Sequence, residues 1–364
     1  MEAEPQTTVD PARVLVIDDS VLIRRVLSVA LAEDPRIDVV GWAVNGAAGL
    51  AKIKKFKPEI VILDMEMPVM GGLEVLETLA TWPNPPKVIV FSQLQAETVM
   101  TALTLGAAEY VVKPANPRGR KEQEARMRDE ILPKILGLLP RLNGDVPVPK
   151  PTPGPRQQTT QWPVEGLVIG ASTGGPNALA SLLAELPPAL NVPILIVQHM
   201  PLIFTRLFAD RLNRVSSLRV AEAQDGEPIE PHRVYVAPGG VHMAVGRGSE
   251  RVIRLEDGPR EHSCKPAVDV LFRSAARSFG PGTLGVVLTG MGRDGCAGAM
   301  QIREAGGHII SQDQASSVVW GMPGAVAKEG ASDAILPLEK IPSEICRRVL
   351  EGKRPRARLI GGMK

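Results

Sequence analysis

The sequence VLVIDDS at residues 14–20 joins a run of branched apolar residues to two carboxylates. A short continuous apolar run of this kind is typical of a strand that is buried on both faces. Four more such runs follow, at residues 37–41, 60–63, 88–91 and 110–112. Segments with helical spacing of apolar residues separate them, such as the segment with Leu22, Val26 and Val29. Five strands alternating with helices predict a doubly wound α/β domain with a parallel sheet.

A second alternation of this type begins at Gly166. Its apolar strand candidates are residues 166–170, 193–197, 233–237, 284–289 and 308–311. Between the two halves lie a charged helix, predicted over residues 120–139, and a stretch of alternating prolines from Pro147 to Pro155. Alternating prolines favour an extended chain, and the polar QQTTQ that follows could not build a core. We therefore predict two doubly wound parallel-sheet domains of the α/β class, joined by a helical and Pro-rich linker.

These patterns divide the chain into four parts. The first domain is expected at residues 12–140, the linker at 141–163, the second domain at 164–352 and a basic tail at 353–364. A length of 364 residues suits two domains of ordinary size. Hydrophobic residues make up 44% and charged residues 23% of the chain, which is the balance of a globular protein.

Composition and charge argue against several classes of function. The net charge of +2 gives no strong attraction to nucleic acid, and no apolar run approaches the roughly 20 residues of a membrane helix. The cysteines, Cys264, Cys296 and Cys346, lack the paired spacing of a disulfide framework or zinc site and fit a reducing compartment. The N-terminal sequence MEAEPQTTVDPARV lacks the apolar core of a signal peptide. We expect a cytoplasmic protein that neither enters a membrane nor binds nucleic acid.

Charged and polar side chains follow four strands of the first domain. Asp18 and Asp19 follow the first strand, Asp64 the third, Ser92 the fourth and Lys113 the fifth. Because the carboxyl ends of parallel strands meet at one edge of a sheet, we expect these groups to converge. Carboxylates so close repel one another, and Mg²⁺, which prefers carboxylate oxygens, relieves that repulsion. Asp64 could then attack a phosphoryl donor, with the cation, Lys113 and Ser92 neutralising the phosphoryl oxygens.

The first half resembles the receiver domain of bacterial response regulators. The matching stretches are VLVIDDS, VILDMEMPVMGGLEVL, VIVFS and GAAEYVVKP. The resemblance implies a flavodoxin-like fold and a histidine kinase as phosphodonor. The site residues that it implies are Asp64 as the phosphorylated residue, Asp18 and Asp19 with Asp64 as Mg²⁺ ligands, and Ser92, Tyr110 and Lys113 as switch residues. Gly71 departs from the family, which commonly has Asp in a Met-Asp-Gly loop there.

The second half has its own polar residues at strand ends. A G-x-S-x-G pattern places Ser172 between a strand and a helix, a context that exposes a serine nucleophile. His199 follows the next strand, and Asp294 lies in a glycine-rich loop after a later one. Imidazole can take the serine proton at neutral pH, and a buried Asp fixes the imidazole tautomer. We predict a Ser-His-Asp hydrolase whose oxyanion donors are the backbone N–H groups of Thr173 and Met291.

Other residues compete for these roles. The alternative bases are His232, in a turn, His308, at the start of a strand, and His242 and His262, in loop-like segments where either could contact substrate. Asp269 begins an amphipathic segment and could be a helix cap. A phosphate-binding glycine loop is the rival interpretation around Ser172, although the third glycine of a dinucleotide fingerprint is absent. A catalytic Cys264 or Cys296 is a further alternative.

The second half resembles the catalytic domain of the chemotaxis protein-glutamate methylesterases, which has a Rossmann-like fold. The matching stretches are IGASTGGP, VQHMP, VYVAPGGVHM, PAVDVLFRSAA, VLTGMGRDG and GMPGAV. By this resemblance Ser172, His199 and Asp294 form the triad, in a chain order that differs from that of α/β-hydrolases. It implies hydrolysis of glutamate γ-methyl esters on chemoreceptor cytoplasmic helices, deamidation of specific receptor glutamines, and no cofactor for the hydrolase. The pair Cys264-Lys265 departs from the His/Arg-Pro character more common in the family.

The two halves together predict a hydrolase that is controlled by phosphorylation. We expect the unphosphorylated receiver to cover the Ser172 site, and phosphorylation of Asp64 to favour an open arrangement. Two other functions stay open: a response regulator with a DNA-binding output, and a metabolic serine esterase that its receiver does not control. Retarded migration of specific DNA fragments would indicate the first, and hydrolysis of small esters regardless of phosphorylation would indicate the second.

Overall fold

The computed structural model describes residues 10–93, 95–113, 120–143, 162–246, 248 and 251–351. Most of the predicted linker and the whole of the predicted basic tail therefore lie outside the described residues. Helix α5 (Arg120–Leu138) and the short 3-10 helix η1 (Pro140–Asn143) end the described part of the first half. Within the ranges given above, no helix combines the length and the apolar character that crossing a membrane requires.

The first domain is built on a five-stranded sheet in the order β2-β1-β3-β4-β5, and every pairing in it is parallel. Its strands are β1 (Ala12–Ile17), β2 (Ile37–Ala43), β3 (Ile60–Leu63), β4 (Lys87–Ser92) and β5 (Glu109–Val112). Its helices, besides α5, are α1 (Val21–Ala32), α2 (Gly46–Phe56), α3 (Gly72–Ala80) and α4 (Ala96–Thr104). This strand order is the flavodoxin-like one. The five predicted strands are all present.

Each face of this sheet packs against its own helices, because successive side chains along a strand point to opposite sides. Val14 and Val16 of β1 belong to a buried cluster that includes Val26 of α1 and Ile131 of α5. Leu15 of β1 belongs to another cluster, which includes buried residues of α2, α3 and α4. The apolar run that opened the sequence analysis is therefore buried on both faces, as predicted.

The second domain is built on a seven-stranded sheet in the order β14-β13-β12-β6-β7-β9-β8, again with parallel pairings. Its strands are β6 (Gly166–Ala171), β7 (Ile194–Gln198), β8 (Arg219–Glu222), β9 (Arg233–Val236), β12 (Thr283–Val287), β13 (His308–Gln312) and β14 (Ala334–Leu336). Its helices are α6 (Gly175–Glu185), α7 (Leu202–Val215), α8 (Val268–Phe279), α9 (Cys296–Glu304), α10 (Met322–Lys328) and α11 (Ile341–Glu351). Helices α8, α9 and α10 cover one face and α6, α7 and α11 the other, which makes the domain doubly wound as predicted.

Some strands of the second domain are not among those predicted. β8 and β14 lie at the two edges of the sheet, and β8 is charged at both ends while β14 has only three residues. β10 (His242–Val245) and β11 (Ile253–Glu256) form a separate antiparallel hairpin. The expectation that His242 lies in a loop is therefore wrong. His242 is 3% exposed in β10, and its ring nitrogens contact the carbonyl of Pro259 and the N–H of Ala267.

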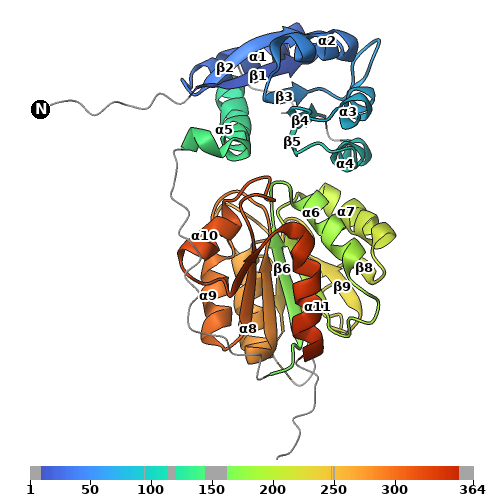
Figure 1. Ribbon diagram of the computed structural model, residues 1–364, viewed down its shortest axis with the longest axis vertical. Helices are drawn as coiled ribbons and strands as arrows, with labels where there is room; N and C mark the ends of the chain where they lie inside the picture. Colours follow the sequence, from blue (N-terminus) through green and yellow to red (C-terminus); the bar gives the residue numbers. More distant parts are fainter. Residues whose placement is uncertain are drawn as a thin grey trace, which may run out of the picture.

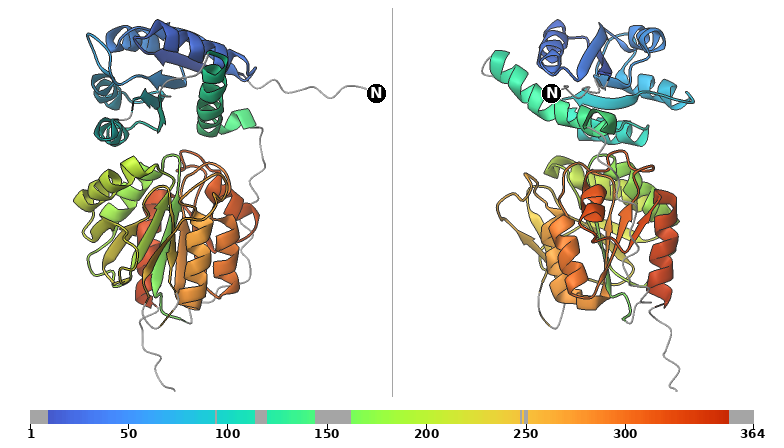
Figure 2. Two further views of the ribbon diagram at one scale, coloured as in Figure 1. Left: turned by 180° about the vertical axis from the view of Figure 1, so that it is seen from behind. Right: turned by 60° about the vertical axis from the view of Figure 1, so that its left-hand side comes forward.

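The first domain stacks on the end of the second domain where the second sheet's strands end at their carboxyl side (Figures 1 and 2). Helix α4 contacts α6 and α7. The rings of Tyr110 in β5 and Phe204 in α7 have centroids 4.9 Å apart. Gly137 of α5 lies so close to the loop after β12 that an added Cβ would be 3.6 Å from Met291 Sδ. The first domain therefore contacts elements on both sides of the predicted active site.

Candidate active site and phosphoacceptor site

Neighbouring strands in the order β12-β6-β7 bring the predicted triad residues to one edge of the second sheet. Ser172 follows β6, and its N–H donates to the carbonyl of Thr289, just beyond β12, at 3.0 Å. His199 follows β7, and its N–H donates to the carbonyl of Ala171 at 3.1 Å. β6 is the first strand of this domain yet lies in the middle of its sheet, so these strand ends meet at the topological switch point, where open α/β sheets bind ligands.

A tight turn places the half-buried Ser172 between β6 and the start of α6. Gly174, two residues later, has a φ of 77°, a left-handed conformation that glycine adopts without strain. A Cβ at Gly174 would also lie 2.6 Å from Val318 Cβ, so a larger residue does not fit. The second glycine of the G-x-S-x-G pattern is thus required by the turn, and the positive end of α6 lies close to Ser172.

His199 and Asp294 are joined side chain to side chain. His199 Nε2 lies 2.8 Å from Asp294 Oδ2, and Asp294 is 1% exposed. Burial on its own would raise the pKa of Asp294, but the hydrogen bond and charge of His199 outweigh it and hold that pKa below its usual value. Burial on its own would lower the pKa of His199, but hydrogen bonds to Asp294 and Cys264 raise it to about 9. Asp294 and His199 thus each stabilise the charged form of the other.

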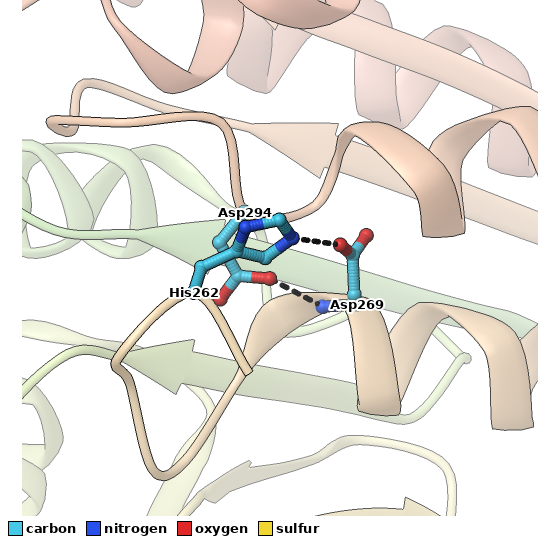
Figure 3. Close-up of side chains that lie close together, drawn as sticks. All are labelled: His262, Asp269 and Asp294. Carbon is cyan, nitrogen blue, oxygen red and sulfur yellow. Dashed lines mark hydrogen bonds and ion pairs between the residues drawn. The ribbon is translucent and has the colours of Figure 1, made fainter. Parts of the chain in front are cut away.

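Backbone N–H groups hold Asp294 in place. Val268 N–H donates to Asp294 Oδ2 at 2.7 Å, and the N–H groups of Asp269 and Gly295 donate to Oδ1 at 2.9 Å each. Val268 and Asp269 begin α8, so the positive end of that helix faces the carboxylate. With the His199 ring, four donors surround Asp294 and fix its orientation (Figure 3 draws the bond to Asp269).

His262, Asp269 and Asp294 lie close enough together to hold a metal ion, with one ligand atom of each within 4.8 Å of the others (Figure 3). However, Asp269 Oδ2 already lies 3.0 Å from His262 Nε2, and Asp269 Oδ1 accepts the N–H of Gly298 at 2.6 Å. Both carboxylates therefore face N–H donors rather than a space for a cation. Asp269 is a helix cap, but it caps the N-terminus of α9 rather than that of its own helix.

Two residues beside the triad make contacts that the sequence did not indicate. Cys264 Sγ lies 3.4 Å from His199 Nδ1. Gln198, the last residue of β7, donates from Nε2 to the carbonyls of Ser172 and His199, at 3.0 and 3.2 Å. A polar residue ending an apolar strand was a signal for Gln198, whereas nothing in the sequence pairs Cys264 with His199.

Within the described residues, no hydrogen bond joins the Ser172 hydroxyl to His199.

The strand ends of the first sheet gather an ion cluster. Lys113 Nζ lies 2.6 Å from Asp64 Oδ2 and 2.9 Å from Asp18 Oδ2. Burial raises the pKa of Asp18, and the charge of Asp64 raises it further, against the effect of Lys113. Burial on its own would lower the pKa of Lys113, but hydrogen bonds to Asp64 and Asp18 outweigh it and raise that pKa. The predicted convergence of these strand ends is thus present.

The other predicted receiver residues lie on two sides of this cluster. Asp19 is exposed, with a carboxylate oxygen within 4.8 Å of those of Asp18 and Asp64. Ser92 is buried at the end of β4, and its carbonyl accepts the N–H of Lys113 at 2.8 Å. Tyr110 instead contacts the second domain, and burial raises its pKa. Tyr110 therefore connects the first sheet with the second domain rather than joining the ion cluster.

Comparison with known proteins gives matches to both halves. Residues 167–345 match the CheB methylesterase family model, and residues 14–122 match the response regulator receiver domain. A protein-glutamate methylesterase/protein-glutamine glutaminase of Nocardioides sp. is 46% identical over 350 residues, covering 93% of this chain and 95% of its own. The protein of that name from Trichodesmium erythraeum is 44% identical over 347 residues, covering 93% and 99%. The chain belongs to the protein-glutamate methylesterase/protein-glutamine glutaminase family.

A solved structure supports the same assignment for the second half of this family member. The crystal structure of the Thermotoga maritima CheB methylesterase catalytic domain is 40% identical and has a TM-score of 0.50, covering 50% of this chain and 97% of its own. The family, the fold class and the hydrolase class predicted from the sequence are confirmed. The second half thus belongs to an enzyme family and not to a DNA-binding output.

The remaining candidate bases of this methylesterase family member have partners elsewhere. His232 Nδ1 lies 3.1 Å from the carbonyl of Pro188, and His308 Nδ1 lies 3.5 Å from Asp333 Oδ2. His262, which lies in a turn as expected, pairs with Asp269. In the described part of the chain, none of these histidines forms a hydrogen bond with Ser172 or Asp294.

Proposed function

We propose that this enzyme hydrolyses glutamate γ-methyl esters on the cytoplasmic helices of chemoreceptors, with Ser172 as nucleophile, His199 as general base and Asp294 as the acid that orients it. The observation that carries the proposal is the pairing of His199 with a buried Asp294, on strand ends next to that of Ser172. The same site deamidates specific receptor glutamines, because ester and amide carbonyls undergo the same acyl transfer.

The reaction proceeds through an acyl-enzyme. Ser172 Oγ attacks the ester carbonyl carbon while its proton passes to His199 Nδ1, the ring nitrogen that does not face Asp294. The tetrahedral intermediate collapses, the bond to the methoxy oxygen breaks, and the imidazolium returns the proton so that methanol leaves. Water then attacks the acyl-enzyme with the same proton transfers, which frees the glutamate side chain and Ser172. A glutamine substrate releases ammonia in place of methanol, and the hydrolase needs no cofactor.

Two backbone N–H groups are available to the oxyanion. Within the described residues, neither Thr173 nor Met291 donates its N–H to another backbone group. Thr173 lies directly after Ser172 at the start of α6, and Met291 lies in the loop after β12, next to the strand end of Ser172. Their N–H groups stabilise the negative charge of the tetrahedral intermediate. Losing one such donor typically lowers kcat about 10²–10³-fold.

In the receiver domain, Asp64 is the residue that a histidine kinase phosphorylates. Asp18, Asp19 and Asp64 fit a Mg²⁺ ion because their carboxylate oxygens lie within 4.8 Å of one another. The buried Asp18 Oδ2 accepts no backbone N–H among the described residues and faces only the mobile ammonium of Lys113, at 2.9 Å, so it suits a cation ligand. When bound, Mg²⁺ neutralises charge on the transferred phosphoryl group. Lys113 and Ser92 would stabilise the remaining oxygens of the phosphoryl group.

The unphosphorylated receiver inhibits the hydrolase by covering its active site. A cavity of ≈ 620 Å³ is lined both by His199 and Cys264 and by the receiver residues Tyr110, Glu130 and Lys134. A folded receptor helix is about 10 Å wide, so it cannot approach His199 from this side while the receiver forms one wall of the cavity. Phosphorylation of Asp64 shifts the population toward an open arrangement. Ser92, Tyr110 and Lys113 transmit that change from the ion cluster to the interface.

The domain limits follow from the same assignments. The receiver domain extends over residues 12–140 and the catalytic domain over residues 164–352, with the linker at 141–163 between them and the basic tail at 353–364. Receptor cytoplasmic helices and a histidine kinase are both partners inside the cell. The enzyme therefore acts in the cytoplasm and requires neither nucleic acid nor insertion into a membrane.

Labelling with a fluorophosphonate tests the nucleophile. The probe should modify the wild-type enzyme and should fail to modify Ser172→Ala, while release of methanol from methylated receptor falls by at least about 10⁴-fold. Thr173→Ser, which keeps the backbone N–H and a small side chain beside the nucleophile, is the matched control and should retain labelling. Persistent labelling of Ser172→Ala would place the nucleophile elsewhere.

A further inference from the structure

Only one ring nitrogen of His199 is left for catalysis in the resting site, and the thiol of Cys264 already contacts that nitrogen. Nε2 lies 2.8 Å from Asp294, so Nδ1 is the nitrogen that must accept the Ser172 proton. Cys264 Sγ lies 3.4 Å from Nδ1, within hydrogen-bond distance for sulfur. The Ser172 hydroxyl makes no hydrogen bond to His199 in the described structure. Sulfur and the serine oxygen therefore compete for the same nitrogen.

The position of this thiol is fixed by the turn that carries it. Glu261 and Cys264 exchange two backbone hydrogen bonds, of 3.1 and 2.8 Å, across His262 and Ser263. Both central residues have positive φ, of 49° and 64°, a conformation that non-glycine residues keep only where their surroundings require it. The side chain of His262 is tied to the buried Asp269 at 3.0 Å (Figure 3). Cys264 is therefore presented to His199 by a constrained turn.

An ion pair holds the first residue of the same turn, Glu261, in place. Arg273 of α8 forms two hydrogen bonds to the carboxylate of Glu261, of 2.9 and 2.5 Å. Such a bidentate pair fixes both the distance and the orientation of the residue that it holds. The turn is thus attached to α8 through Asp269 and Arg273, and α8 is also the helix whose first N–H groups hold Asp294. One element therefore positions both neighbours of the catalytic imidazole.

We propose that Cys264 is a positioning residue for His199, whose thiol holds Nδ1 in the resting enzyme and gives it up to Ser172 when the ester binds. This inference rests on the proposed triad and adds to it a residue that acts through the base. While His199 is neutral, the thiol S–H donates to Nδ1 and keeps the proton of the ring on Nε2, which is the tautomer that serine activation needs. While His199 is protonated, Nδ1–H donates to the sulfur.

Other charged groups near His199 are already paired. The charged residues that line its cavity are Arg260 and Lys265 on the segment that carries Cys264, and Glu130 and Lys134 on α5 of the receiver. Lys265 pairs with Asp257, and Arg260 donates to the carbonyl of Ser263 at 3.2 Å. On the receiver side, Lys134 lies 3.3 Å from Glu109, and Glu130 lies 3.3 Å from Arg126. Asp294 and the Cys264 contact are thus the groups that directly act on the ring, and both favour its protonated form. Removing the thiol should therefore make the neutral imidazole available at lower pH.

The pH dependence of methanol release by the full-length enzyme tests this role. In Cys264→Ala the acid limb of the kcat/KM profile should move to lower pH by about half a unit or more, the size expected for one hydrogen bond to a charged group. At pH values on that limb, kcat/KM should rise about threefold. Cys264→Ser, whose hydroxyl can also bond an imidazole nitrogen, should recover at least half of the shift. Cys346→Ala, with a cysteine on α11, should match the wild type.

Alkylation gives a second measurement that does not depend on the variant's own geometry. Iodoacetamide should inactivate the wild type and Cys346→Ala in step with modification of Cys264, followed by mass spectrometry, and should leave Cys264→Ala active. An acid limb of Cys264→Ala that coincides with the wild type would overturn the proposal, as would equal shifts in Cys264→Ala and Cys264→Ser or full activity of enzyme alkylated at Cys264. If Ser172→Ala were active, the triad itself would fail, so the two failures are distinguishable.

Discussion

The two sheets place charged side chains at the same kind of edge, yet the two clusters differ in what surrounds their carboxylates. In the described part of the receiver, backbone N–H groups bind only one oxygen of Asp18 and Asp64. Ser20 N–H donates to Asp18 Oδ1 and Met65 N–H to Asp64 Oδ1, whereas both Oδ2 atoms face Lys113. In the catalytic domain, Asp294 accepts from three N–H groups and contacts the His199 ring. Both clusters bring three potential ligand residues within 4.8 Å.

The difference shows that proximity of acidic groups does not by itself make a cation site. A carboxylate whose oxygens already face N–H donors is fixed in orientation and suits an imidazole partner. A carboxylate that keeps one oxygen without a backbone N–H donor, beside others of like charge, suits a hard divalent cation. On the proposed function, the receiver cluster is the one that would hold Mg²⁺, because Asp18 and Asp64 each keep one oxygen without a backbone N–H donor in the described structure.

Removal of divalent cations should give the largest difference between the two sites: it should slow phosphorylation but leave hydrolysis unchanged. With EDTA, phosphorylation of Asp64 by a phosphodonor should slow by about 10²–10³-fold or more, because the charge on the phosphoryl group is no longer neutralised. Methanol release by the unphosphorylated enzyme should not change, because the donors around Asp294 leave no place for a cation. Incorporation of labelled phosphate and release of methanol, measured on the same samples, give the comparison.

The control for this experiment is Asp64→Asn, which should lose phosphorylation with Mg²⁺ present and keep its unphosphorylated hydrolase activity. A hydrolase that EDTA inhibits would contradict the distinction, since a cation would then act at His262, Asp269 and Asp294. Recovery of the hydrolase activity on addition of a divalent metal would confirm that the hydrolase uses a cation.

A rise in pH should destabilise the catalytic domain more than the receiver domain. The pKa of His199 is raised from 6.5 to about 9 in the folded protein, so its pairing with Asp294 contributes fully below pH 6.5 and is lost as pH rises through 9. This shift corresponds to as much as about 3 kcal/mol. The pKa of Lys113 is also raised, but from 10.5, so the receiver cluster keeps its contribution over the same interval.

Hydrogen exchange of peptides from each sheet measures this difference. After correction for the intrinsic pH dependence of exchange, peptides of β6 and β7 should lose up to about 10²-fold in protection between pH 6.5 and 9.5, and those of β1 and β3 should not. In His199→Gln, whose side chain cannot titrate, the protection of β6 and β7 should not fall between pH 6.5 and 9.5. An equal loss in both domains of the wild type would refute the assignment to His199.

Much of both sites could be predicted from the sequence, because strand-end residues of parallel sheets converge wherever the strands are recognised. The runs before Asp18, Asp64, Ser172 and His199 are continuous and apolar, so their ends could be located without a structure. The predicted triad and ion-cluster residues do lie at these ends. What the resemblance added was the choice among several histidines, which spacing alone did not settle.

The parts that the sequence did not predict depend on contacts between distant segments. β10 and β11 are short and lie outside the main sheet, so nothing in their local pattern marked His242 as buried. Cys264 and His199 are 65 residues apart and meet only because a turn with two positive φ angles brings them together. The capping of α9 by Asp269 likewise joins two helices, and local capping rules apply within one.

The smallest predicted effect concerns the contact that joins the two regions. Tyr110 and Phe204 form a tilted ring pair with centroids 4.9 Å apart, and such a pair contributes about 0.5–1.5 kcal/mol beyond its burial. Tyr110→Ala should therefore weaken the docking of the receiver and raise the unphosphorylated rate of methanol release by about two- to tenfold. The rate after phosphorylation should change less, because the receiver has then already moved from the site.

Tyr110→Phe is the matched control, since it keeps the ring and should retain the wild-type rate. Phe204→Ala is less informative, because Phe204 is fully buried and its loss would disturb α7 itself. An unphosphorylated rate of Tyr110→Ala equal to that of the wild type would mean that this contact does not hold the receiver closed. The inhibitory contact would then have to lie along α4 or α5, and the carboxylate clusters of the two sheets would be coupled through those helices instead.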